Sequence, residues 1–162
     1  MLYNHQRFTK EKAWQKIKYY CAYQQRSHQQ VKEKLYSLGL HKTETEQLLS
    51  QLIEENYLNE ERFAAAFASG KFNIKKWGKI KIEYELKQKK VSIYNIRNAL
   101  KQIDEKEYFL TLQKLAKHKW ENFKHEQYIN RQTKTMHYLM QKGYEPQLAQ
   151  QAIKSIRENA KL

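Results

Sequence analysis

The chain has 162 residues, only four glycines and one proline, and a formal net charge of +14. Scarce turn residues disfavour a multi-stranded sheet, and abundant Gln, Lys and Glu favour helices, so we expect an all-α protein. No apolar stretch is long enough to cross a membrane, and residues 1–12 lack the apolar region of a signal peptide. These features lead us to expect a cytoplasmic protein.

The first helices are placed by their capping residues. Thr9 is a candidate N-cap for the first helix, and Ser27 for a second helix that ends at Gly39. Thr43 and Glu46 have the spacing of a capping box for a third helix. Apolar residues recur at helical spacing after each start, so the three helices are expected to form one packed unit.

A second unit follows with the same order of signals. Asn59 is the N-cap of its first helix, Gly78 stands at the start of its second helix, and Ser92 caps its third. Lys90 occupies the position that Gly39 has in the first unit. A residue other than glycine costs on the order of 1 kcal/mol in a left-handed turn, so we expect this turn to adopt another geometry.

In the third unit, Asp104 and Glu107 have capping-box spacing, and Pro146 suits the first turn of the last helix. The helix-to-turn sequences of the three units match at offsets of 51 and 53 residues (35 to 86, 86 to 139). Such a repeat predicts an elongated array of three tandem three-helix repeats rather than one globule. Its parts are an N-terminal arm and three units, at residues 1–9, 10–58, 59–103 and 104–162.

The positive charge favours a partner with negative charge, and nucleic acid, alone or inside a protein complex, is the leading class. The alternative is a soluble protein that is merely basic. The densest basic run holds eight lysines against Glu83 and Glu85, namely Lys71, Lys75, Lys76, Lys79, Lys81, Lys87, Lys89 and Lys90. Eight ammonium groups along one turn and helix are enough to neutralise several phosphates.

Aromatic side chains are interleaved with these lysines. At about 100° per residue, Trp77, Ile80 and Tyr84 gather on the side of the helix opposite Ile82 and Leu86. Such rings suit stacking on exposed bases or burial against a protein partner. The alternative is that Trp77 and Tyr84 pack between adjacent repeats. A second basic region follows at Lys114, Lys117, Lys119, Lys124, Arg131 and Lys134.

The residue types that carry catalysis are not arranged for it. The six histidines show neither a metalloprotease spacing nor a Cys–His ligand set, and no phosphate-binding glycine loop is present. Cys21 follows Ile17 by four residues on an apolar stripe, which fits a buried reduced thiol. We therefore expect no enzyme activity, no metal and no cofactor.

Four stretches of sequence carry a resemblance to a known family. They are Arg-Ser leading to Val31 and Lys-Leu at residues 26–35, the run from Leu48 to Leu52, Tyr-Leu-Asn-Glu-Glu-Arg-Phe-Ala at 57–64, and Gly-Lys-Ile-Lys-Ile-Glu-Tyr-Glu-Leu at 78–86. Over about residues 10–158 the chain resembles the RecX family of bacterial regulators of the RecA recombinase. The resemblance implies an array that lies in the groove of a RecA–DNA filament. There it would restrain ATP turnover, strand exchange and coprotease activity in homologous recombination, DNA repair and the SOS response.

The chain departs from the family pattern at two places. His28, Gln29 and Gln30 stand where acids usually follow the serine, and Lys81 stands where arginine is usual. Neither change removes a chemical site, because the family is not one of enzymes.

The basic run and the resemblance together predict a contact surface of Lys75, Lys76, Lys79, Lys81 and Lys87, with Arg26 as an addition. The partners that we expect are the RecA filament and DNA, bound directly or within the filament, and we expect the protein to be a monomer. The alternative is a basic helical DNA- or RNA-binding protein unrelated to RecA. In that case, affinity for bare nucleic acid accounts for all of its activity.

Overall fold

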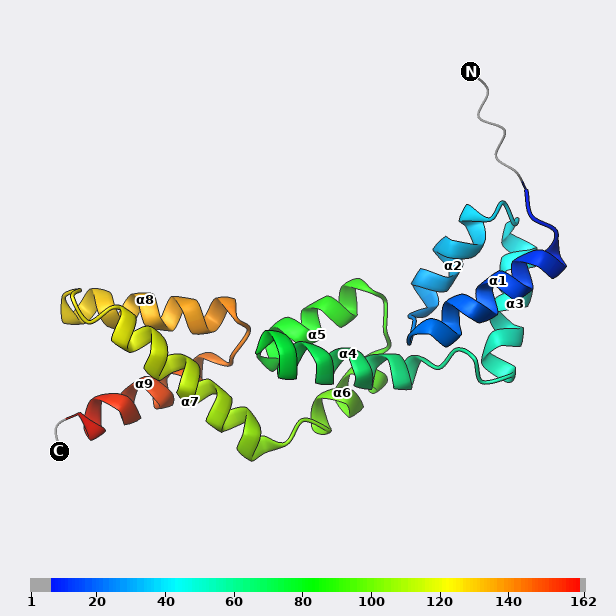
Figure 1. Cartoon of the computed structure of the whole chain (residues 1–162). Helices are drawn as coiled ribbons and strands as arrows, with labels where there is room; N and C mark the ends of the chain where they lie inside the picture. Colours follow the sequence, from blue (N-terminus) through cyan, green and yellow to red (C-terminus); the bar gives the residue numbers. More distant parts are fainter. Residues whose placement is uncertain (1–6, 161–162) are drawn as a thin grey trace, which may run out of the picture.

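The computed structural model describes residues 7–160, and this part of the chain folds into nine α-helices without a strand. Figure 1 shows them in successive groups, set one after another along an extended molecule. The predicted fold class is confirmed: an all-α, elongated array of three tandem three-helix repeats. Of the predicted arm at residues 1–9, residues 1–6 lie outside the described part. Phe8 packs against the first unit, and its N–H donates to the Leu38 carbonyl at 3.0 Å.

The first unit contains α1 (Lys10–Tyr23), α2 (His28–Ser37) and α3 (Lys42–Glu54). Both predicted caps at its start are confirmed, because the Thr9 and Ser27 hydroxyls accept hydrogen bonds from N–H groups in the first turns of their helices. Gln30 completes a capping box, since its side chain accepts the Ser27 N–H at 2.9 Å. The Gln30 amide therefore accepts the same N-cap hydrogen bond that a carboxylate would accept at this position.

The predicted capping box of Thr43 and Glu46 is wrong. Helix α3 begins earlier, with His41 as its N-cap, and the His41 N–H donates to the Glu44 carboxylate at 3.4 Å. The Arg7 guanidinium donates to the same carboxylate at 2.7 Å. That hydrogen bond is the main cause that lowers the pKa of Glu44. Glu44, anchored from outside the helix, thus takes the place expected for Glu46.

The second unit contains α4 (Glu60–Lys75), α5 (Lys79–Gln88) and α6 (Ile93–Lys101), with Asn59, Gly78 and Ser92 as N-caps as predicted. The expectation that the turn at Lys90 differs from its counterparts is wrong. Lys90 has φ 59°, in the same left-handed region as its counterpart Gly39.

The same motif closes the second helix of every unit, and it explains why Lys90 adopts a left-handed conformation. The N–H of Leu40, Val91 or Tyr144 donates to a carbonyl five residues earlier, at 3.1–3.3 Å, and the side chain of each is buried. This is the Schellman arrangement, which needs a left-handed residue just before the buried one. Burial of Val91 therefore outweighs the conformational cost at Lys90.

The third unit contains α7 (Glu105–Asn122), α8 (Tyr128–Gln141) and α9 (Pro146–Asn159). The Asp104 carboxylate accepts the N–H of Glu107 at 2.9 Å, so it supplies half of the predicted capping box. Pro146 is the first residue of α9, where its missing N–H and fixed φ suit a helix start.

The buried side chains form two cores. One core lies within the first unit and includes Ile17, Leu35 and the buried Cys21, as predicted for that thiol. The other runs without a break through the second and third units. The boundary between the first two units instead carries a groove whose first-unit side is formed by polar side chains, Gln24, Gln25 and Gln30. Units two and three are thus joined by apolar packing, and the first unit has a core of its own.

Candidate functional site

The second and third units meet where the start of α5 touches the turn after α8. The Gly78 N–H donates to the Lys142 carbonyl at 2.8 Å, and the Ile80 N–H donates to the Gly143 carbonyl at 2.9 Å. A Cβ atom on Gly78 would lie 2.3 Å from the Gly143 carbonyl carbon and oxygen. Only glycine lets these two backbones come so close, and their contact fixes α5 relative to the third unit.

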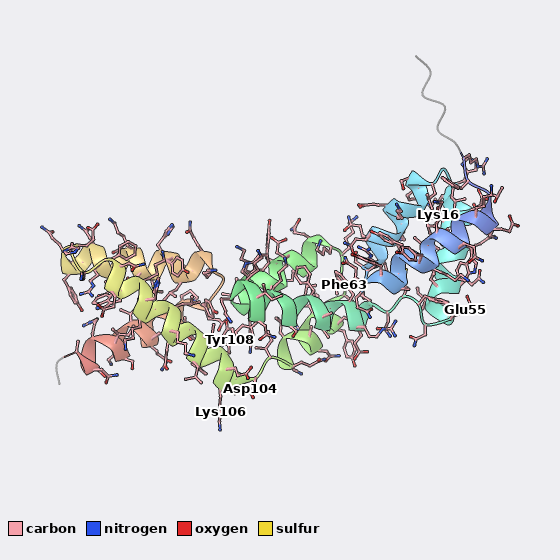
Figure 2. All side chains as sticks on the ribbon, in the orientation of Figure 1. Lys16, Glu55, Phe63, Asp104, Lys106 and Tyr108 are labelled. Carbon is pink, nitrogen blue, oxygen red and sulfur yellow. The ribbon has the colours of Figure 1, made fainter. Side chains whose placement is uncertain are left out.

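Two buried tyrosines brace this junction from inside. The Tyr108 hydroxyl donates to the Glu145 carboxylate at 2.7 Å and accepts the Lys79 N–H at 3.0 Å. The Tyr144 hydroxyl donates to the Lys76 carbonyl at 2.9 Å. Burial raises the pKa of both phenols, so both remain protonated donors at neutral pH. Figure 2 shows Tyr108 on α7 close to the second unit.

Four lysines gather at the surface of this junction, and we call them the junction lysines: Lys75, Lys81, Lys119 and Lys142. The Lys142 ammonium donates to the Lys75 carbonyl at 2.9 Å. Partial burial lowers the pKa of Lys142, and the charges of Lys81, Lys75 and Lys119 lower it further. No described carboxylate forms a salt bridge with any of the four. The cluster is therefore a concentrated positive charge without an internal counter-ion.

Aromatic rings hold two of these ammonium groups in place. The Lys81 ammonium lies 4.4 Å from the centre of the Trp77 ring, and the Lys119 ammonium lies 4.4 Å from that of Tyr138. Trp77 is half-buried against the shared core, which agrees with the packing alternative for this residue. Tyr84 is 59% exposed, so the same alternative is wrong for Tyr84. Of the predicted aromatic stripe, Trp77 thus packs against the core, whereas Tyr84 lies at the surface.

The five lysines predicted as a contact surface do not share one face. Lys75 and Lys81 belong to the junction lysines, whereas Lys79 lies about 200° around α5 from Lys81. Lys87 follows Lys79 by two turns and pairs with Glu83 at 3.0 Å. Lys76 ends α4 in a left-handed conformation with φ 59°, and its ammonium donates to the Asn73 carbonyl at 2.8 Å.

Arg26 lies in the loop between α1 and α2 of the first unit, and Figure 1 shows the second unit between the first unit and the third. Its Nε donates to the Tyr20 carbonyl at 3.0 Å, and its guanidinium lies 3.7 Å from the centre of the Tyr20 ring. Arg131 makes the equivalent pair of contacts with Trp120 in the third unit, at 2.8 Å and 4.1 Å. Both arginines thus close the end of the first helix of their unit.

Lys142 is the residue that the sequence-based prediction missed. It lies 67 residues from Lys75 along the chain, and no local pattern links the two. The one available signal is its position directly before Gly143, in the turn that repeats the pattern at Gly39 and Lys90.

The described residues give no support to a metal site. Within residues 7–160, no three His, Cys, Asp or Glu side chains are placed to hold a metal ion together. In the same part of the chain, no helix combines the length and the apolar character that a membrane span requires.

Family models identify the two units that form this junction. The model of the second three-helix domain of RecX matches residues 59–100, and that of the third three-helix domain matches residues 105–153. Together they take in more than half of the chain. The chain belongs to the RecX family.

Individual relatives agree with this assignment. The regulatory protein RecX of Lactobacillus gasseri is 33% identical over 89 residues, which is 55% of this chain and 33% of that protein. The regulatory protein RecX of Bacillus cereus is 21% identical over 148 residues, which is 91% of this chain and 55% of that protein. The chain thus spans between a third and about half of the length of these curated relatives.

Solved RecX structures share the fold. The crystal structure of RecX from Lactobacillus salivarius superposes with a TM-score of 0.83 at 23% identity, over 91% of this chain and 96% of that one. A second crystal structure of a regulatory protein RecX gives a TM-score of 0.82 at 23% identity, over 90% of this chain and 71% of that one. The chain therefore has the same fold as these two structures.

Proposed function

We propose that this protein binds the RecA–DNA filament and inhibits RecA ATP hydrolysis, strand exchange and coprotease activity. Membership of the RecX family carries the proposal, and the name of its relatives, regulatory protein, favours a regulator over an enzyme. The partners would be the RecA filament and DNA, contacted directly or within the filament. The setting would be homologous recombination, DNA repair and the SOS response in the cytoplasm.

The junction lysines supply the physical means of binding. They are held on a framework fixed by backbone hydrogen bonds and buried tyrosines, so little freedom is lost when an anion binds. Lys81, Lys75 and Lys119 each repel Lys142, and this repulsion adds to partial burial in lowering the pKa of Lys142. A phosphate or carboxylate placed among them relieves this repulsion, and binding would weaken as salt rises.

Inhibition follows if binding favours one filament conformation. An elongated array has the shape to contact more than one RecA protomer, and such contacts can favour one conformation of the filament over another. A ligand shifts such an equilibrium only by its differential affinity for the two states. Contacts that span neighbouring protomers without strain in one state, but are strained in the other state, would provide that difference in affinity.

The proposal is tested by measuring RecA ATP hydrolysis on single-stranded DNA while this protein is titrated in. We expect inhibition at well below one molecule per RecA protomer, with DNA in excess. If ATP hydrolysis falls only when all DNA is coated, the protein competes for DNA. In that case, the alternative of a basic nucleic-acid-binding protein holds.

Charge reversal tests the surface. The variant K75E/K81E/K119E should lose inhibition, because it replaces three of the junction lysines with acids. The control K32E/K101E/K106E changes the net charge equally at exposed positions, one in each unit, and should inhibit as the wild type does. Figure 2 shows the control position Lys106 pointing away from the array. The variant K79E/K87E tests the other side of α5, and far-ultraviolet circular dichroism checks that all three variants fold.

A further inference from the structure

A groove of about 520 Å³ lies on the first unit, away from the junction lysines. Side chains from α1, from α2 and from the loop between them form its walls and floor. No carboxylate is among them: they are Gln15, Lys16, Tyr19, Tyr20, Tyr23, Arg26, Lys34 and Leu38. Figure 2 labels Lys16 on α1, which carries most of these side chains. The lining thus combines aromatic rings with positive charge.

Two tyrosines on α1 present their rings to solvent. Tyr19 and Tyr23 are each 72% exposed and stand one turn apart, with ring centres 6.5 Å apart and planes inclined by 32°. Neither belongs to the core of the first unit, so packing gives no reason for a large ring at either position. Tyr20, by contrast, is partly buried against that core and also lines the groove.

Three cations line the same groove. The guanidinium of Arg26 lies 3.7 Å, and the ammonium of Lys34 lies 5.6 Å, from the centre of the Tyr20 ring. The ammonium of Lys16 stands on the α1 side, 4.9 Å from the centre of the Phe8 ring. The salt bridges of the described residues involve none of the three. A ligand with flat apolar faces and regularly spaced negative charge complements this arrangement.

We propose that this groove is a binding site for single-stranded DNA. Unpaired bases stack on Tyr19 and Tyr23, and backbone phosphates lie against Lys16 and Lys34. Stacking needs the base faces that a duplex hides, so the site favours single strands over double strands. The geometry of the groove alone favours a single strand of nucleic acid. The choice of DNA over RNA rests on the function proposed above.

The test is direct binding of a labelled oligothymidylate of about 15 nucleotides to the full chain, followed by fluorescence anisotropy without RecA. The variant Y19A/Y23A should bind about tenfold more weakly for each base that loses its stacking partner. Y19F/Y23F, which keeps both rings, should bind as the wild type does. Tyr94 on α6 has the same exposed fraction, 72%, so Y94A is the matched control and should leave affinity unchanged.

The salt dependence provides a second readout. K16Q and K34Q should each lower the slope of log affinity against log salt by about 0.7, the amount lost with one phosphate contact on a single strand. K106Q removes an exposed lysine far from the groove and should leave the slope unchanged.

Several results overturn the proposal. It is wrong if Y19A/Y23A binds the oligonucleotide as the wild type does, or if Y94A weakens binding equally. Tighter binding of the matching oligouridylate than of the DNA would assign the groove to RNA. If Y19A/Y23A keeps the DNA affinity of the wild type but no longer inhibits RecA, the groove binds a protein partner instead. Because the binding assay contains no RecA, its outcome is independent of the proposed filament function.

Discussion

Replacing Gly78 with alanine tests the junction between the second and third units. The new methyl group would overlap the Gly143 carbonyl, which lies 2.3 Å from the position of its carbon. Backbone atoms cannot turn aside as a flexible side chain does, so the two units must separate at this point. Separation lengthens the hydrogen bonds from Gly78 to Lys142 and from Ile80 to Gly143, at present 2.8 and 2.9 Å.

The cost follows from those two hydrogen bonds. Each contributes about 1 kcal/mol, and a buried donor left without a partner, such as the N–H of the buried Gly78, costs about 1–3 kcal/mol. We therefore expect Gly78→Ala to lower the free energy of unfolding by about 2–4 kcal/mol. Urea denaturation followed by circular dichroism measures this change. Tryptophan fluorescence gives a second signal, from Trp77 and Trp120 in the two units concerned and from Trp14 in the first unit.

The same substitution at Gly70 is the matched control. Gly70 lies inside α4, and a Cβ atom there meets nothing within 4 Å. Alanine is the better helix former by about 0.5–1 kcal/mol, so Gly70→Ala should stabilise the protein. Opposite signs for the two variants are the expected result. Equal effects, or a neutral Gly78→Ala, would refute the argument that close backbone contact holds the units together.

Two further predictions concern single residues. Lys90→Gly should raise the free energy of unfolding by up to about 1 kcal/mol, because a residue with a Cβ atom then no longer has to adopt a left-handed conformation. Urea denaturation measures this change, and a loss of stability would contradict the reasoning. Burial raises the pKa of the Cys21 thiol to about 11 from 9.0, and the Arg26 cation only partly opposes the shift. At pH 8, a thiol reagent should therefore react at least about 100-fold more slowly with the native protein than with the unfolded chain, and equal rates would contradict it. The unfolded chain releases this proton first, so the contribution of the thiol to stability is present below pH 9 and is lost as pH rises toward 11.

The sequence was a good guide to the fold because its signals are local. Thr9, Ser27, Asn59 and Ser92 cap the helices expected of them, since a cap depends on residues within one turn. The failure at α3 has a non-local cause. Arg7 lies 37 residues from Glu44 in the chain, and its hydrogen bond anchors the acid that takes part in the cap.

The turn at Lys90 shows the opposite kind of failure. The sequence indicates the local cost of a left-handed lysine, but it does not show the benefit that outweighs this cost. That benefit is burial of Val91, which depends on how the helices of the unit pack. Local propensity is overruled when a buried side chain fixes the path of the chain.

The candidate site was only partly predictable for the same reason. The count of lysines between Lys71 and Lys90 is a property of the sequence, but their division between two sides of α5 depends on what each side contacts. The turn at Gly143 covers one side and brings Lys142 to Lys75. A cluster built from elements so far apart appears only when the repeats are stacked.

The two kinds of boundary in the array have different consequences for binding. Units two and three share one core and a close backbone contact, so the junction lysines keep a fixed geometry. The first unit has its own core and carries the tyrosine groove. If both surfaces bind along one DNA–protein filament, binding at the first makes binding at the second intramolecular, which raises the overall affinity without any new contact. The gain is lost if the geometry forbids simultaneous engagement. The residues that join α3 to α4, and the polar groove beside them, are therefore the part of the molecule that sets how far the two sites act together.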